Sequence, residues 1–270
     1  GRNSPSEDDY ATARSYWEKL VEIDDSTVLG HESRARILWS YDKKWGQADI
    51  EYRKASEVDP SCQSPAAFLE WMGRRKEYLS RTEQLMEQAD PLSPNQQLMT
   101  AYRFLWHGQY DRAIAQAEKT LALESSCWGC YAIISTSYRQ KGMEAEAFEA
   151  TLDELRVRDS SEEETRAVEE AVQQSGMKGV ARLSLKQRLE EKGGPAINLA
   201  MAYAELGEDD QAFEWLEKSW NQPLWGYENA PSNRRLDPLR DDPRFAQLLR
   251  KLNLPEEAIQ RHLSIPATSD

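Results

Sequence analysis

Apolar residues recur at intervals of three and four along most of this chain, and this spacing places side chains on one face of an α-helix. A first helix is predicted over residues 9–23. Its apolar face comprises Tyr10, Ala13, Trp17 and Leu20. Two further helices are predicted within residues 29–60, where Asp59-Pro60 ends the second one because proline disfavours helix at the residue before it. No stretch sustains the apolar–polar alternation of a strand, so the pattern predicts an all-α fold.

The sequence repeats itself after 34 residues. Residues 108–114 align with residues 142–148, and in each copy an alanine follows a glycine by five positions. A small residue where two helices cross lets their backbones approach, and glycine permits the turn between them. The same position holds Ala48, Ala113, Ala147 and Ala212, at intervals of 65, 34 and 65 residues. Each long interval equals one full period and one shortened period, which predicts degenerate helix pairs near residues 61–93 and 161–192.

The repeats divide the chain into four predicted parts. Residues 1–27 form a polar arm and a leading helix, and residues 28–222 form five to six helix pairs. Residues 223–254 form a loop and a helix that caps the end of the array, as terminal repeats require. We expect the rings of Trp220, Trp225 and Tyr227 to make capping or anchoring contacts. Asp237 and Asp242 each precede a proline, which predicts two carboxylate-capped helix starts, and residues 255–270 are predicted to be a tail.

With the repeats placed, the chain resembles tetratricopeptide repeat (TPR) proteins, whose helix pairs repeat every 34 residues. It is similar in particular to the C-terminal TPR regions of bacterial winged-helix transcriptional regulators and of TPR-containing serine/threonine kinases. The matching segments are residues 41–48, 90–94, 108–114, 175–179, 202–217 and 236–245. The resemblance implies an α-solenoid, a right-handed superhelix of antiparallel helix pairs. It also implies a non-catalytic sensory or regulatory module of a larger bacterial signalling protein.

Composition and charge restrict the function classes. The 270 residues carry a formal net charge of −13, which argues against nonspecific binding to nucleic acid. Residues 144–170 hold eleven carboxylates and three arginines, a balance of −8, which predicts a solvated acidic face or a surface for a basic partner. The sequence contains no run of 18 apolar residues, so no membrane span is predicted within it. The first residue, Gly1, suggests a tag remnant on a piece of a longer protein, so the compartment, cytoplasmic or extracytoplasmic, is left open.

The sharpest candidate for chemistry is the Cys127-Trp128-Gly129-Cys130 motif. A CxxC motif at a helix start exchanges disulfides in some proteins, but its usual place follows a strand, and here both flanks are helical. We therefore expect small structural residues, paired as a local disulfide in an oxidising compartment. A zinc site needs further ligands, and Cys62 is the only other cysteine. His31, His107 and His262 are far apart and no catalytic motif is present, so we predict no enzyme, no metal and no cofactor.

The resemblance implies a protein or peptide partner held in the concave groove that is lined by the first helix of each pair. The positions counted as groove-lining or beside it are Ile37, Leu98, Tyr102, Trp106, Ala132, Thr136, Arg139, Ile197 and Met201. The lysine and asparagine that clamp a peptide carboxylate in some TPR proteins are absent at these positions. An apolar groove with Tyr102, Trp106 and Arg139 suits an extended peptide or a partner helix. The alternatives are core packing for these residues, and homo-oligomerisation or thiol-redox chemistry for the whole chain.

Overall fold

The computed structural model describes residues 7–59, 66–87, 90–190, 195–221 and 231–265, and every regular element in these ranges is helical. The predicted all-α class is therefore confirmed. The chain divides into two compact units. Unit 1 comprises residues 1–82 and 193–268, and unit 2 comprises residues 83–192 with the last two residues. No helix in the described ranges combines the length and the apolar character needed to span a bilayer.

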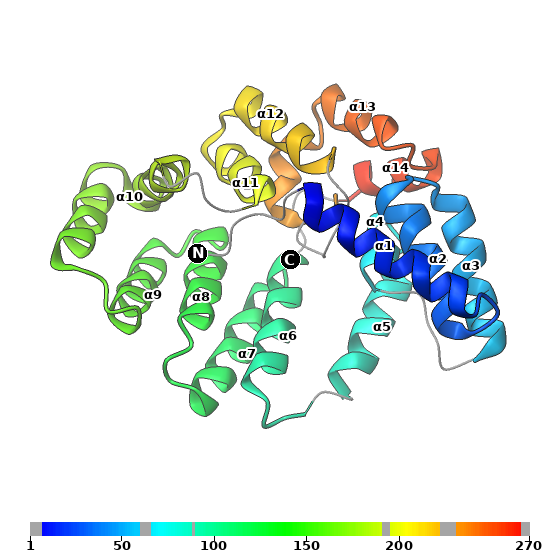
Figure 1. The fold of residues 1–270 in the computed structure, drawn as a ribbon. Helices are drawn as coiled ribbons and strands as arrows, with labels where there is room; N and C mark the ends of the chain where they lie inside the picture. Colours follow the sequence, from blue (N-terminus) through cyan, green and yellow to red (C-terminus); the bar gives the residue numbers. More distant parts are fainter. Residues whose placement is uncertain (1–6, 60–65, 88–89, 191–194, 222–230, 266–270) are drawn as a thin grey trace. The chain divides into compact units, whose positions relative to one another are not determined.

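Unit 2 is a row of sequential helix pairs (Figure 1, green). Its helices are α6 (Pro94–Trp106), α7 (Tyr110–Leu123), α8 (Trp128–Gln140), α9 (Glu144–Val157) and α10 (Glu162–Glu190). Helix α6 packs on α7 and α8 packs on α9, while α6 also contacts α8. Ala113 and Ala147 are fully buried in these pairs, as the 34-residue pattern predicts. The connecting glycines, Gly108 and Gly142, both take φ +73°, the left-handed conformation that ends a helix and allows the turn.

The second degenerate region forms α10, in which two helices meet at a kink. Ser175 and Gly176 leave helical geometry there, and Gly176 has φ +60°. The sequence predicts a helix end at this glycine. The segment Ser161-Glu162-Glu163-Glu164 has the pattern of a capping box, and the structure forms it at the start of α10. Ser161 Oγ accepts a hydrogen bond from the Glu164 amide at 3.2 Å, and Glu164 Oε2 accepts one from the Ser161 amide at 3.0 Å.

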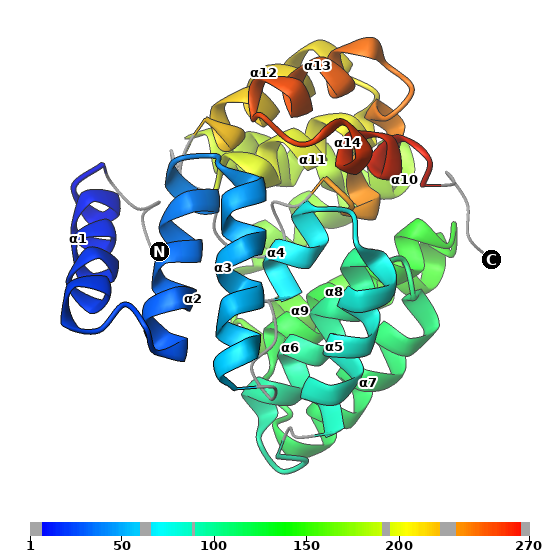
Figure 2. The same ribbon diagram turned by 90° about the vertical axis from the view of Figure 1, so that its right-hand side faces the viewer.

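Unit 1 contains the remaining helices (Figures 1 and 2), except that residues 83–87 at the end of α5 belong to unit 2. They are α1 (Glu7–Ile23), α2 (Val28–Arg36), the π-helix η1 (Ile37–Tyr41), α3 (Trp45–Val58), α4 (Ala66–Trp71), α5 (Arg75–Glu87), α11 (Ala196–Leu206), α12 (Asp209–Trp220), the 3₁₀ helix η2 (Arg234–Leu239), α13 (Pro243–Lys251) and α14 (Glu256–Leu263). Two sequential pairs, α2 with α3 and α11 with α12, bury Ala48 and Ala212 completely. In the first pair, Lys43 stands where the other pairs have glycine and takes φ +55°.

The C-terminal cap has more structure than the sequence pattern predicts. Helix α13 begins at the predicted carboxylate cap, where Asp242 Oδ1 accepts a hydrogen bond from the Arg244 amide at 2.8 Å. Asp237, also expected to cap a helix, instead lies inside η2 and pairs with Arg234 at 2.8 Å and Arg240 at 2.7 Å. A carboxylate between two arginines that are almost fully buried holds η2 in place.

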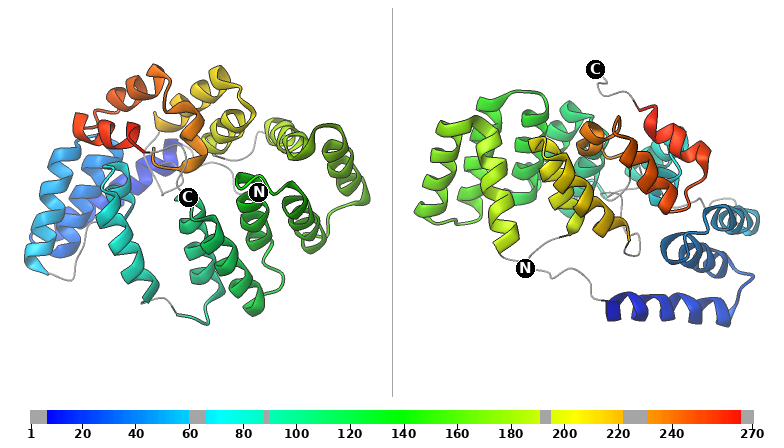
Figure 3. Two further views of the ribbon diagram at one scale, coloured as in Figure 1. Left: turned by 180° about the vertical axis from the view of Figure 1, so that it is seen from behind. Right: turned by 90° about the horizontal axis from the view of Figure 1, so that it is seen from above.

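The predicted tail is wrong in part, because residues 256–263 form α14 (Figure 3, red). Ala258, Ile259 and His262 are fully buried, a stripe too short to be recognised as a helix from the sequence. The Nε2 atom of His262 lies 2.8 Å from the carbonyl oxygen of Trp71, which anchors α14 to α4.

The expected capping contact of Trp220 is present. Its ring lies in edge-to-face geometry with the rings of Trp71 and Phe245, at centroid distances of 5.8 Å and 5.7 Å. The other two rings expected in the capping loop, Trp225 and Tyr227, lie outside the described residues, and so does Cys62.

Candidate partner-binding face

The predicted groove residues of unit 2 gather on two neighbouring helices. On α6 they are spaced by four and eight residues, and on α8 by four and seven, so each set lies along one face of its helix. These residues, here called the α6–α8 face, are Leu98, Tyr102, Trp106, Ala132, Thr136 and Arg139. All six are partly exposed, whereas Phe104 and Leu105 on α6 and Ile133 and Ile134 on α8 are buried. The face therefore remains accessible beside a packed core.

Two aromatic rings form the centre of the α6 part of this face. Tyr102 and Trp106 are one helical turn apart, and their rings stack with centroids 5.6 Å apart and an interplanar angle of 20°. Side chains spaced by four residues on a helix are neighbours, so α6 alone sets this stack. Stacked rings of this kind present a broad apolar surface with a polar hydroxyl at one edge.

The two helices of the face meet at Gly129, in the first turn of α8. A Cβ atom placed on Gly129 would lie 3.3 Å from the Tyr102 hydroxyl oxygen and 3.6 Å from both terminal methyl groups of Leu98. Because Gly129 has no side chain, the side chains of Tyr102 and Leu98 can pack directly against the backbone of α8. The sequence pattern gives Gly129 no role, because its contacts come from Leu98 and Tyr102, which lie 31 and 27 residues earlier in the chain.

Charged groups near Tyr102 influence its protonation. Burial, together with the negative charge of Glu154, raises the pKa of the Tyr102 phenol. Burial also raises the pKa of Glu154, although the guanidinium groups of Arg158 and Arg188 act in the opposite direction. Arg158 lies 3.5 Å from the Glu154 carboxylate. At neutral pH the phenol is therefore a neutral hydrogen-bond donor, suited to a carbonyl or carboxylate of a partner.

The predicted groove is not assembled from all the expected residues. Ile197 and Met201 on α11 are 0% and 2% exposed and belong to the core of unit 1, which is the core-packing alternative. Ile37 begins the π-helix η1 in unit 1 and is partly exposed. The candidate face described here is therefore confined to unit 2.

Cys127 and Cys130 form a disulfide across the first turn of α8. Cys127 is the N-cap residue of this helix and Cys130 is its third residue. The two cysteines belong to the same apolar core as Ala101 and Ile133, against which Leu98 and Tyr102 pack. Among the described residues, no group of three or more His, Cys, Asp or Glu side chains is placed to hold a metal ion.

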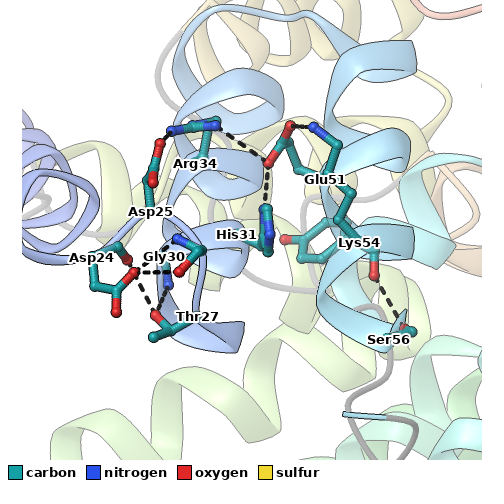
Figure 4. Close-up of polar contacts among 11 residues, drawn as sticks. Asp24, Asp25, Thr27, Gly30, His31, Arg34, Glu51, Lys54 and Ser56 are labelled. Carbon is teal, nitrogen blue, oxygen red and sulfur yellow. Dashed lines mark hydrogen bonds and ion pairs between the residues drawn. The ribbon is translucent and has the colours of Figure 1, made fainter. Parts of the chain in front are cut away.

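A second polar cluster, missed by sequence analysis, joins α2 to α3 in unit 1 (Figure 4). The buried carboxylate of Glu51 lies 2.8 Å from His31 Nδ1 and 2.8 Å from Lys54 Nζ. Arg34 lies 3.8 Å from the same carboxylate and 2.8 Å from Asp25. Burial alone would raise the pKa of Glu51, but the hydrogen bonds from Lys54 and His31 and the charges of Lys54 and Arg34 lower it. Both carboxylate oxygens are thus engaged, and the cluster links the helices of the first pair.

No protein-family model matches this chain, and a search of curated proteins finds no match either. The helical architecture and the α6–α8 face are therefore the observations on which a functional assignment can be based.

Proposed function

We propose that this chain is a non-catalytic peptide-binding module of the TPR type, the sensory or regulatory part of a larger bacterial signalling protein. In this proposal the helix pairs follow one another as a right-handed superhelix, and the α6–α8 face holds the partner. The 34-residue period and the buried alanines at the helix crossings support the repeat type. The sequence resemblance alone supports the regulatory context.

The partly exposed Tyr102–Trp106 stack is the observation that carries the proposal. Aromatic rings and arginine contribute most of the binding energy in many interfaces, because they bury a large area and retain a polar group. Arg139, in the last turn of α8, adds a cation to the same face. An extended segment with apolar side chains and a free carbonyl or carboxylate fits this combination of groups.

The proposal is tested by selecting random peptides on phage against the full chain and measuring Kd for the selected sequences. The Tyr102→Ala variant and the Arg139→Ala variant are each expected to bind the peptides about tenfold more weakly or worse, which is the loss typical of a central interface contact. Circular dichroism should match the parent chain, because both side chains are partly exposed. Tyr102→Ala also removes packing against the core of unit 2 and should lower the melting temperature, so binding is compared at a temperature at which both variants are fully folded.

Matched controls distinguish this face from any other surface. Tyr16→Ala removes an exposed tyrosine from α1, and Arg156→Ala removes an exposed arginine from α9. Both variants should bind like the parent chain. Peptides that bind all four variants equally well would place the partner elsewhere, and a failure to select any peptide would count against the proposed function.

A further inference from the structure

The Cys127–Cys130 disulfide encloses the backbone on which part of the α6–α8 face rests. Only Trp128 and Gly129 lie between the two cysteines, and Gly129 carries the close contacts to Tyr102 and Leu98. A change at the disulfide therefore acts directly on the turn that supports these two side chains. Trp128 points outward and is 55% exposed.

The two cysteine residues differ in exposure and in position. Cys127 retains 8% exposure and Cys130 has none, so an incoming thiol reaches Cys127 first. Cys127 is also the N-cap of a helix of 13 residues, where the aligned peptide dipoles stabilise a negative charge. A helix N-terminus thus favours a negatively charged leaving sulfur over a neutral one at Cys127, and a disulfide whose reduced form is stabilised is more easily reduced.

We propose that this disulfide is a reversible redox switch, acted on by dithiols, that sets the affinity of the α6–α8 face for its peptide. The inference rests on the proposed function, since it concerns regulation of that same face. The structure has the oxidised state, in which Leu98 and Tyr102 lie against Gly129. Reduction removes the covalent link between the N-cap residue and the third residue of α8. The first turn of α8 then shifts and the support for Tyr102 changes.

The exchange balances with a dithiol as the reductant. One thiolate of the dithiol attacks Cys127 Sγ, the bond between the cysteines breaks, and its electron pair leaves on Cys130 Sγ, which takes a proton. The second thiolate then attacks the dithiol's own sulfur in the mixed disulfide and releases Cys127 as a thiolate at the start of α8. Two electrons pass to the protein, and the dithiol becomes a disulfide.

The first measurement is the state of the two thiols. The full chain carrying Cys62→Ser, so that only this pair remains, is equilibrated in its folded state with reduced and oxidised dithiothreitol at several ratios. The exchange is quenched with acid, and the chain is unfolded and alkylated with a maleimide polymer. Both thiols should become reactive in excess reduced reagent and unreactive again in excess oxidised reagent, with helicity unchanged. A pair that stays protected under native reducing conditions overturns the inference, whatever the chain binds.

The second measurement links the thiols to the face. With fluorotyrosine incorporated, the ¹⁹F signal of Tyr102, assigned with Tyr102→Phe, should shift on reduction, and Gly129→Ala should move it while the disulfide is intact. Peptides selected against the oxidised chain should bind the reduced chain about tenfold more weakly, a loss of about 1.4 kcal/mol. The Cys127→Ser/Cys130→Ser variant should bind the peptides with the affinity of the reduced chain. If that variant does not fold, the peptide affinities of the oxidised and the reduced parent chain are compared instead.

The outcomes separate the two proposals. Equal peptide affinity in the two redox states overturns the switch and leaves the proposed function intact. An absence of peptide binding in both states overturns the proposed function, and this inference with it.

Discussion

The two units of this protein have cores of different composition. Unit 1 buries large rings that contact one another in series, at centroid distances of 5.8 Å for Trp45–Trp71, 5.8 Å for Trp71–Trp220 and 5.7 Å for Trp220–Phe245. The core around α6–α8 in unit 2 is built mainly from small and aliphatic side chains, together with the buried ring of Phe104. Its fully buried members are Ala101, Ala113, Ala117, Cys130 and Ile133.

This difference shows two uses of aromatic residues within one helical chain. In unit 2, Tyr102 and Trp106 lie on a partly exposed face beside the core. In unit 1, rings from α3, α4, α12 and α13 meet in one cluster, and burying them supplies a large share of the apolar contact. Large rings thus form much of the core of unit 1, whereas Tyr102 and Trp106 of unit 2 are partly exposed.

The largest expected effect comes from removing a ring in each unit. Trp71 is fully buried, and Trp71→Ala should destabilise unit 1 by about 3–5 kcal/mol through the lost contacts and the cavity left behind. Trp106→Ala, on the partly exposed face, should cost less than about 1 kcal/mol. Urea unfolding followed by circular dichroism and tryptophan fluorescence measures both. Similar losses for the two variants would mean that the contrast between the cores is wrong.

The next effect is the response of unit 1 to acid. His262 is fully buried next to the positive charges of Arg240 and Arg261, and burial is the main cause that lowers its pKa from 6.5 to about 4. As the pH falls below 6.5, the unfolded chain binds a proton at this residue while the folded chain stays neutral until about pH 4. The stabilisation is therefore present above pH 6.5 and is lost between 6.5 and 4.

His262→Gln tests this dependence, because glutamine can still donate a hydrogen bond to the Trp71 carbonyl but does not titrate. Between pH 7.5 and pH 5, the parent chain should lose on the order of 2 kcal/mol more unfolding free energy than the variant. Tryptophan fluorescence is the appropriate probe, since the buried rings of unit 1 report its unfolding. Parallel pH profiles for the two chains would exclude His262 as the cause.

The smallest effect concerns the turn glycines. Gly207 has φ +77° and no atom within 4 Å of an added Cβ, so Gly207→Ala should cost about 1 kcal/mol through backbone strain alone. Gly46 also has open space around it but lies within α3 without a positive φ, so Gly46→Ala should stabilise by about 0.5–1 kcal/mol. Thermal melting of the two variants should shift in opposite directions. A shift in the same direction would show that packing, and not backbone conformation, governs these positions.

Local features of the sequence predicted much of the fold. The 34-residue period identified the helix pairs, the crossing alanines are fully buried, and Gly176 marks the break in α10. Helix α14 was missed because its buried residues span little more than one turn, and its anchor, the Trp71 carbonyl, belongs to a distant helix. The predicted groove positions differ in burial. Tyr102 and Met201 are each the ninth residue of a repeat, counted from residues 94 and 193, yet one is partly exposed and the other is buried.

The sequence by itself determined which segments are helical, where they pair and which small residues lie at the crossings. These properties depend on side chains within one helix pair, so they can be predicted from the spacing of residues in the 34-residue period. The tertiary structure alone decided which outward stripe stays exposed, what Gly129 supports and what holds α14, because each depends on side chains brought in from other parts of the chain. Spacing along the chain sets the face on which a residue lies, and only the surrounding helices decide whether that face is buried.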